Sequence, residues 1–231
     1  MRNWLLPVFC LFCHQPSEDE LLCNDCWKEL PWQSFSCHKC GQMLPTVDAR
    51  ICGQCLKTPP IYDNTICIFH YQNPIDKLIL GLKFSEKLIY AKLLGELMYQ
   101  ILSQYYQTQP KPDCIIPVPL HHARLKERGY NQALEIARPI AKKFKIPLAI
   151  TQCQRILATA PQSSMLSIEA RAKNIKRAFW VDVPLPWRHV VIFDDVVTTG
   201  HTVTALASTL KKAGVDRVDI WCCARTHLKT Q

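Results

Sequence analysis

Residues 190–202 constrain the fold most, because they join an apolar run to two acids and then to a loop of small hydroxyl residues. The apolar run starts at Val190, the acids are Asp194 and Asp195, and the loop ends at Thr202. A continuously apolar strand is typical of the middle of a parallel sheet. A helix that starts directly after such a strand offers backbone N–H groups and a favourable dipole to an anion. The segment therefore predicts an α/β fold with a phosphate-binding site.

The parts of this segment have distinct roles in binding a phosphorylated sugar. Gly200 lets the main chain approach a phosphate closely, and the threonines add hydroxyl donors. The two carboxylates can accept hydrogen bonds from the vicinal hydroxyls of a ribose and help to hold Mg²⁺. An ordinary strand–turn–helix with an acidic turn is the alternative. The candidate catalytic residues are Asp194 and Asp195, and the candidate ligand-binding residues of the loop are Val196, Val197, Thr198, Thr199, Gly200, His201 and Thr202.

The segment resembles the signature of type I phosphoribosyltransferases, and the whole chain resembles the ComF family of competence proteins (ComFC- and GntX-like). The further matches are Pro117–His121, Arg124–Gln132, Arg155 with Thr159 and Gln162, and Arg171 with Asn174. The resemblance covers essentially the whole chain, including its cysteine-rich front (residues 1–60). It implies a type I phosphoribosyltransferase-like parallel sheet flanked by helices, and phosphoribosyl pyrophosphate (PRPP) with Mg²⁺ as the ligand.

The resemblance also implies the residues that would bind the pyrophosphate. The loop after the strand at 114–118 would contribute Pro119, Leu120 and His121. Arg124, Lys126 and Arg128 would bind phosphate oxygens, for which a planar guanidinium gives bidentate contact. The alternative for these three is a solvated basic helix start. Lys83 is a further candidate ligand residue, with a structural role as an equal alternative.

Two positions depart from the pattern of the family. His201 stands where a small residue is usual, which leaves backbone donation intact but affects access to the loop. Glu86 stands where we expect a glycine, which weakens the assignment of Lys83 to the ligand.

Eight of the 13 cysteines form four C-x-x-C pairs in the first 60 residues. Each pair places two thiolates on one side of a tight turn, and two pairs complete a tetrahedral zinc site. The spacing favours two consecutive structural Zn²⁺ sites, with a crossed pairing of the knuckles still open and redox-active pairs as a competing interpretation. The proposed metal ligands are Cys10, Cys13, Cys23 and Cys26 in one group and Cys37, Cys40, Cys52 and Cys55 in the other.

The chain divides at Pro59–Pro60 into a zinc-ribbon domain, 1–60, and a phosphoribosyltransferase-like domain, 61–231. Apolar periodicity in the second part predicts alternating strands and helices. Strands are expected at 65–71, 114–118, 148–155, 190–193 and 218–224. Helices are expected from Pro74, at 87–105, at 130–144, in a short basic segment at 168–175 and from Thr202 to Gly214, with a loop at 156–167.

Composition, charge and the apolar runs of the chain indicate where in the cell it acts. The formal charge of +9 falls to about +5 once eight thiolates bind two Zn²⁺, so the chain is modestly basic. No apolar run reaches the roughly 18 residues of a membrane span. The apolar start at 4–12 lacks a small-residue cleavage site and contains Cys10, so we expect a cytoplasmic protein rather than an exported one.

The family resemblance implies a function in natural transformation, in which the protein handles incoming single-stranded DNA together with DNA-uptake or recombination proteins. Trp4, Trp27 and Trp32 are available to stack on bases, with packing around the zinc sites as the alternative. An enzyme of nucleotide metabolism or salvage, which transfers phosphoribose to a base or an amine, is the second hypothesis. No sequence motif identifies an acceptor pocket.

Overall fold

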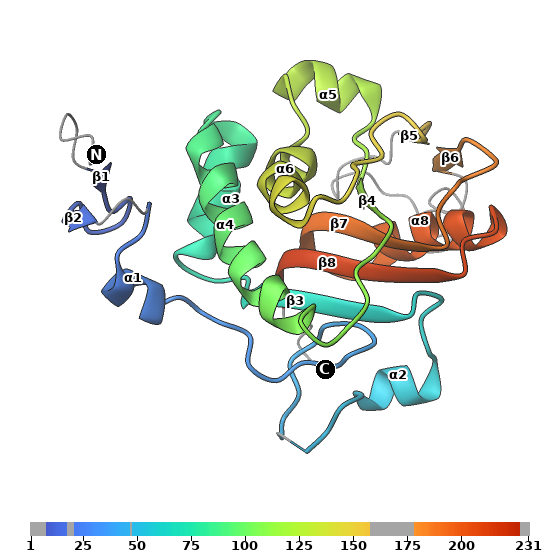
Figure 1. Ribbon diagram of the computed structural model, residues 1–231, viewed down its shortest axis with the longest axis horizontal. Coiled ribbons are helices and arrows are strands. Elements are labelled where there is room, and N and C mark those ends of the chain that lie inside the picture. Colours follow the sequence, from blue (N-terminus) through green and yellow to red (C-terminus); the bar gives the residue numbers. More distant parts are fainter. Residues whose placement is uncertain (1–7, 18–20, 47, 158–177, 227–231) are drawn as a thin grey trace, which may run out of the picture.

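A four-stranded parallel sheet forms the centre of the chain in the computed structural model, which describes residues 8–17, 21–46, 48–157 and 178–226 (Figure 1). Its strands, in spatial order, are β3 (Asn64–His70), β8 (Arg217–Arg225), β7 (His189–Val197) and β4 (Cys114–Pro117). All three pairings are parallel. The apolar segment at 190–193 thus lies on an interior strand, as predicted, and the α/β class with a parallel sheet is confirmed.

Helices cover both faces of this sheet (Figure 1). One face packs against α3 (Ile75–Phe84), α4 (Leu88–Tyr105) and α6 (Gln132–Phe144). The other face packs against α8 (His201–Lys212), whose chain then turns at Gly214 with a φ of 93°. The apolar face of α3 is buried, since Ile75, Leu78, Ile79 and Leu82 are at most 3% exposed. A short helix that the sequence did not predict separately, α5 (His122–Arg128), ends at Gly129 in the left-handed conformation.

α4 and α6 pack unusually closely. A Cβ atom added at Gly95 would lie 2.6 Å from the carbonyl oxygen of Ile136 and 2.3 Å from Pro139 Cγ. Because protein interiors are packed to crystal density, this contact leaves no room for a side chain at residue 95. The crossing of the two helices therefore depends on a glycine at this position.

The expected strand at 148–155 is largely wrong. Only β5 (Cys153–Arg155) forms, and it pairs antiparallel with β6 (Phe179–Val181) in a separate two-stranded sheet. Leu148 makes a single parallel bridge to Ile115 of β4. The segment is divided because its two ends pair with different partners. The predicted basic helix at 168–175 and most of the predicted loop at 156–167 lie outside the described residues.

The cysteine-rich front contains short elements around its thiols. They are the antiparallel pair β1 (Val8–Phe9) and β2 (Pro16–Ser17), α1 (Asn24–Lys28) and α2 (Gly53–Lys57). This front packs along β3 through backbone hydrogen bonds, from Gln33 N to Ile68 O at 2.9 Å and from Thr65 N to His38 O at 2.7 Å. It therefore covers an edge strand that would otherwise be open to pairing. Within the described residues, each helix is too short or too polar to cross a bilayer.

Candidate functional site

Asp195 stands near the carboxyl end of β7 and is 3% exposed. Lys83 Nζ, from the end of α3, lies 2.5 Å from its Oδ2 atom. Gln132 Nε2, from the start of α6, lies 3.5 Å from Oδ1. A buried carboxylate is stable only when it is paired and hydrogen-bonded. The tertiary structure therefore brings Lys83, one of the proposed ligand residues, to one of the two proposed catalytic acids.

Asp194 occupies the preceding position, and its Oδ1 atom accepts a hydrogen bond from the backbone N–H of Asp195 at 3.0 Å. Burial, followed by the negative charge of Asp195, raises the pKa of Asp194 well above its ordinary value. Two adjacent carboxyl groups, one half-buried and one buried, favour a bound cation, because it offsets their mutual repulsion. Carboxylate oxygens are ligands that suit Mg²⁺, so the donor set of this site fits that ion.

The loop after these acids leads directly into a helix N-terminus. Val196 and Val197 complete β7, and Thr198 and Thr199 are exposed. Gly200 is the N-cap residue of α8, with a φ of 80° that an L side chain would strain. Gly200 has no side chain to cap this end of α8, so within the described residues its first backbone N–H groups remain available to an anion.

The first residues of α8 complete the proposed phosphate loop. His201 is exposed and Thr202 is half-buried. The side chain of His201 therefore projects from the loop without filling it. Its unusual residue type leaves the backbone donors in place.

The loop after β4 reaches the same edge of the sheet as the loop after β7. Because β4 and β7 are parallel neighbours, their carboxyl ends meet there, and Val118 N donates to Phe193 O at 2.8 Å. Pro119 and Leu120 are half-buried. His121 is the N-cap of α5, and its Nδ1 atom accepts from Ala123 N at 3.3 Å. The structure thus brings the two loops of the predicted site together.

The arginines of α5 differ in their surroundings. Arg124 is exposed at the start of the helix. Arg128 donates to Gln132 Oε1 at 2.6 Å, and its guanidinium lies 5.6 Å from the ring centroid of Phe84. Arg128, Gln132, Asp195 and Lys83 therefore form one continuous polar network. In this arrangement Arg128 orients Gln132 toward the acid.

Arg155, one of the residues that carry the family resemblance, lies beside the loop after β4. Its backbone forms a bridge with His121. Its burial and the charge of Arg124 lower its pKa, whereas the charge of Asp194 acts in the opposite direction. Arg155 thus lies close enough to both Arg124 and Asp194 for their charges to act on it, and an anionic ligand would offset the repulsion between the two arginines.

Residues Tyr130 and Asn131 hold the connection between α5 and α6, and sequence reasoning gave them no role. The Tyr130 hydroxyl donates to the Leu82 carbonyl of α3. Asn131 caps α6 by accepting from Ala133 N at 3.0 Å, and it donates to Val118 O at 3.0 Å. These bonds fix the start of α6, and with it Gln132, against the site. Asn is a preferred N-cap residue, so Asn131 directly before the helix is the sequence signal that could have indicated its capping role.

The cysteines form two groups with the consecutive pairing. The four thiols of each group lie within 4.8 Å of one another. Sγ separations of 3.6 Å between Cys13 and Cys23 and of 3.7 Å between Cys40 and Cys52 are far longer than the roughly 2.05 Å of a disulfide. Four convergent thiols suit tetrahedral Zn²⁺, and a closed set of this kind is structural. The groups are Cys10, Cys13, Cys23 and Cys26, and Cys37, Cys40, Cys52 and Cys55.

The tryptophans of the front pack against each other and against the sheet. The ring centroids of Trp27 and Trp32 are 4.7 Å apart, and Trp32 lies 4.8 Å from Phe69 of β3. Both indole N–H groups are already bonded within the protein. The two rings nevertheless line a groove of about 340 Å³ between the front, β3 and α4, together with Tyr105. Trp4 lies outside the described residues.

These features define a class of protein: a parallel α/β domain with two Cys₄ sites in front of it. A family model described as the double zinc ribbon domain matches residues 1–67. Competence protein F of Haemophilus influenzae is 36% identical over 88% of this chain and 90% of its own length. DNA utilization protein YhgH of Escherichia coli K12 is 34% identical over 96% of this chain and 98% of its own. The chain therefore belongs to the competence protein F family, as its sequence predicts.

Two more distant similarities were also found. Competence protein ComFC of Streptococcus pneumoniae is 21% identical over 94% of this chain and 99% of its own length. A purine phosphoribosyltransferase from Pyrococcus horikoshii covers 70% of this chain and 78% of its own, at 19% identity and a TM-score of 0.29. A similarity at that TM-score supports no inference about the site.

Proposed function

We propose that this chain binds PRPP, or a related ligand with a ribose 5-phosphate group, together with Mg²⁺. The observation that carries the proposal is the uncapped N-terminus of α8, which directly follows the Asp194–Asp195 pair at one edge of the sheet. Backbone donors for a phosphate and carboxylate acceptors for ribose hydroxyls therefore lie next to each other in the chain.

Specific roles follow for the residues of the site. The 5-phosphate binds to backbone and hydroxyl groups from Val196 to Thr202, and Asp194 binds the ribose hydroxyls and contributes to the Mg²⁺ site. The pyrophosphate lies against Pro119–His121, near Arg124. Asp195 pairs with Lys83. Binding of Mg²⁺ would compete for Asp195 and release Lys83 toward the phosphates.

Mg²⁺, when bound, would neutralise charge on the pyrophosphate as it leaves. The chain's own residues position the ligand and stabilise charge, which is most of what phosphoribosyl transfer requires. An active phosphoribosyltransferase of nucleotide metabolism or salvage is therefore the second candidate function. It requires an acceptor base or amine next to C1 of the ribose.

We further propose that the protein acts in the cytoplasm on incoming single-stranded DNA during natural transformation, with DNA-uptake or recombination proteins as partners. The names of its relatives, competence protein F and DNA utilization protein YhgH, support this. The charge distribution also supports it, since residues 61–231 carry 23 Lys and Arg against 13 Asp and Glu. The front would contribute aromatic surface at Trp27 and Trp32, while the basic domain follows the phosphate backbone. Base stacking would thus belong to the proposed domain 1–60 and contacts with the phosphate backbone to the proposed domain 61–231.

Calorimetric titration of PRPP with Mg²⁺ tests the ligand site. We expect binding by the native protein and by the control Asp182→Asn, whose aspartate is exposed on the segment after β6. The double variant Asp194→Asn/Asp195→Asn should lose binding while keeping its far-ultraviolet circular dichroism. Equal binding by the double variant would refute the site. Release of pyrophosphate in the presence of a panel of bases and amines would then distinguish enzyme from binding protein.

Fluorescence anisotropy with a labelled single-stranded oligonucleotide tests the second part. We expect affinity that falls steeply as the salt concentration rises, because bound lysines and arginines release counterions from the strand. Absence of binding even at low salt would remove the proposed role in handling DNA.

A further inference from the structure

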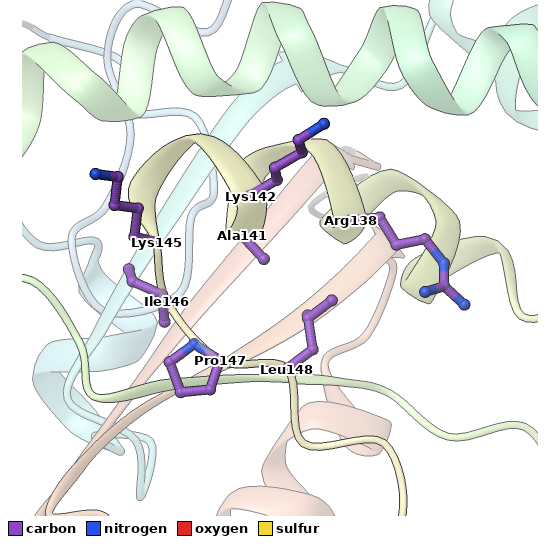
Figure 2. Close-up of a pocket in the computed structure, with 7 residues that line it drawn as sticks. All are labelled: Arg138, Ala141, Lys142, Lys145, Ile146, Pro147 and Leu148. Carbon is purple, nitrogen blue, oxygen red and sulfur yellow. The ribbon is translucent and has the colours of Figure 1, made fainter.

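An open pocket lies at the far end of α6 from Asp195 (Figure 2). It has a volume of about 580 Å³. The pocket residues from Arg138 to Lys145 lie about 9–20 Å along the helix from Gln132, which contacts Asp195, at about 1.5 Å per residue. It is therefore separate from the proposed PRPP site. Its lining residues are Arg138, Ala141, Lys142, Lys145, Ile146, Pro147 and Leu148.

The floor of this pocket is aliphatic. Figure 2 shows Ala141, Ile146, Pro147 and Leu148 at its centre, and none of the seven lining residues is aromatic or acidic. Pro147 is exposed and Leu148 is half-buried, so both remain accessible. An accessible aliphatic floor suits an apolar side chain of a partner better than a nucleobase, which favours aromatic stacking.

Three cations, Arg138, Lys142 and Lys145, also line the pocket (Figure 2). Arg138 and Lys142 lie four residues apart on α6, which is about 6 Å along the helix, and Lys145 follows at its C-terminus. Glu135 accepts from Arg138 Nε at 3.1 Å, whereas Lys142 and Lys145 have no acidic partner within the described residues. A helix C-terminus favours lysines by itself. All three cations, however, also line the same pocket, so an anionic group bound there would interact with each of them.

A free backbone edge completes the site. Ile115 N donates to Pro147 O at 3.0 Å, and Ala149 N donates to Ile115 O at 2.9 Å. Since the two flanking residues bond to β4, the N–H and C=O groups of Leu148 point away from it. Neither group has a partner in the described parts of the chain. Leu148 therefore offers one donor and one acceptor at the edge of the sheet.

We propose that this pocket binds an extended acidic peptide segment of a partner protein. The peptide adds to the sheet edge through the backbone of Leu148, as in strand-addition complexes. One of its apolar side chains fills the aliphatic floor, and its acidic side chains lie beside Lys142 and Lys145. The charges of the rim match an acidic segment and repel a basic one.

Fluorescence anisotropy with a labelled peptide pool tests this inference. The pool has aspartates on both sides of one leucine, isoleucine, phenylalanine or methionine, and the matched pool has serine at that position. We expect the apolar pool to bind at low salt and the serine pool to bind more weakly. Lys142→Glu/Lys145→Glu should weaken binding about tenfold. The control Lys212→Glu reverses an exposed charge in the last turn of α8 and should leave binding unchanged.

The other outcomes each overturn the proposal. They are no binding of the apolar pool, equal binding of the serine pool, or equal loss in the Lys212→Glu control. Loss of oligonucleotide affinity in Lys142→Glu/Lys145→Glu with peptide binding intact would assign the pocket to nucleic acid instead. PRPP binding by the same variant should equal that of the native protein, because neither lysine is near Asp195. Failure of the peptide test is therefore distinguishable from failure of the proposed function.

Discussion

Removing the charge of Lys83 should destabilise the protein strongly, because it leaves Asp195 without its cation. The Lys83 side chain is 21% exposed and that of Asp195 is 4% exposed, with 2.5 Å between Nζ and Oδ2. Breaking a buried ion pair by removing one partner costs about 3–5 kcal/mol. The partial exposure of the lysine places Lys83→Met at the low end, about 3 kcal/mol. For a chain of this size, that lowers the melting temperature by about 6–12 °C.

Thermal unfolding followed by circular dichroism, with zinc held constant, measures this effect. The control is Lys77→Met, an exposed lysine of the same helix, which should shift the melting temperature by less than about 2 °C. Adding Asp195→Asn to Lys83→Met removes the unpaired charge. It should recover part of the loss, with a coupling energy of about 2 kcal/mol between the two sites.

Two results would refute this reasoning. One is a melting temperature of Lys83→Met close to that of the native protein. The other is strict additivity of the two substitutions, which would mean that the lysine and the acid do not interact in solution.

Three further predictions concern the helix crossing, the zinc sites and the start of α6. Gly95→Ala should cost about 2 kcal/mol by chemical denaturation because its methyl group meets Pro139, whereas Gly53→Ala, with open space around it, should be near neutral. A native stability for Gly95→Ala would contradict the close helix contact. Cys37→Ser should lose one of two zinc ions by elemental analysis, and retention of both would exclude it as a ligand. Asn131→Ala should cost about 1 kcal/mol and weaken PRPP binding, so an unchanged stability would argue against its capping role.

The residue pattern of the segment at 190–202 predicts the order of its elements but not their exact ends. Its apolar run, acids and glycine predict a buried strand, then a loop, then a helix, and these elements follow one another in the structure. The end of the strand was less well predicted. β7 continues through both acids to Val197 because β8 pairs with it as far as Arg225. A strand's length depends on its partner, which the sequence of one segment does not contain.

The zinc ligands could be predicted almost completely from the sequence. Each C-x-x-C knuckle is formed by neighbouring residues, so its geometry is local. The pairing of knuckles was open, and the fold groups each knuckle with the next one along the chain. The strand expected at 148–155 failed for the opposite reason: its apolar residues fit a strand, but its two ends bond to different neighbours.

Sequence by itself therefore determined the α/β class, the strand–loop–helix order at 190–202, the zinc ligands and the family, because each rests on residues close together in the chain. Only the tertiary structure decided the pairing of Lys83 with Asp195, the orientation of Arg128 toward Gln132, and the free edge at Leu148. Lys83 and Asp195 come from α3 and β7, and no periodic pattern records which helix end packs against which strand. Such contacts are set by how whole elements pack, and burial then makes their electrostatics strong.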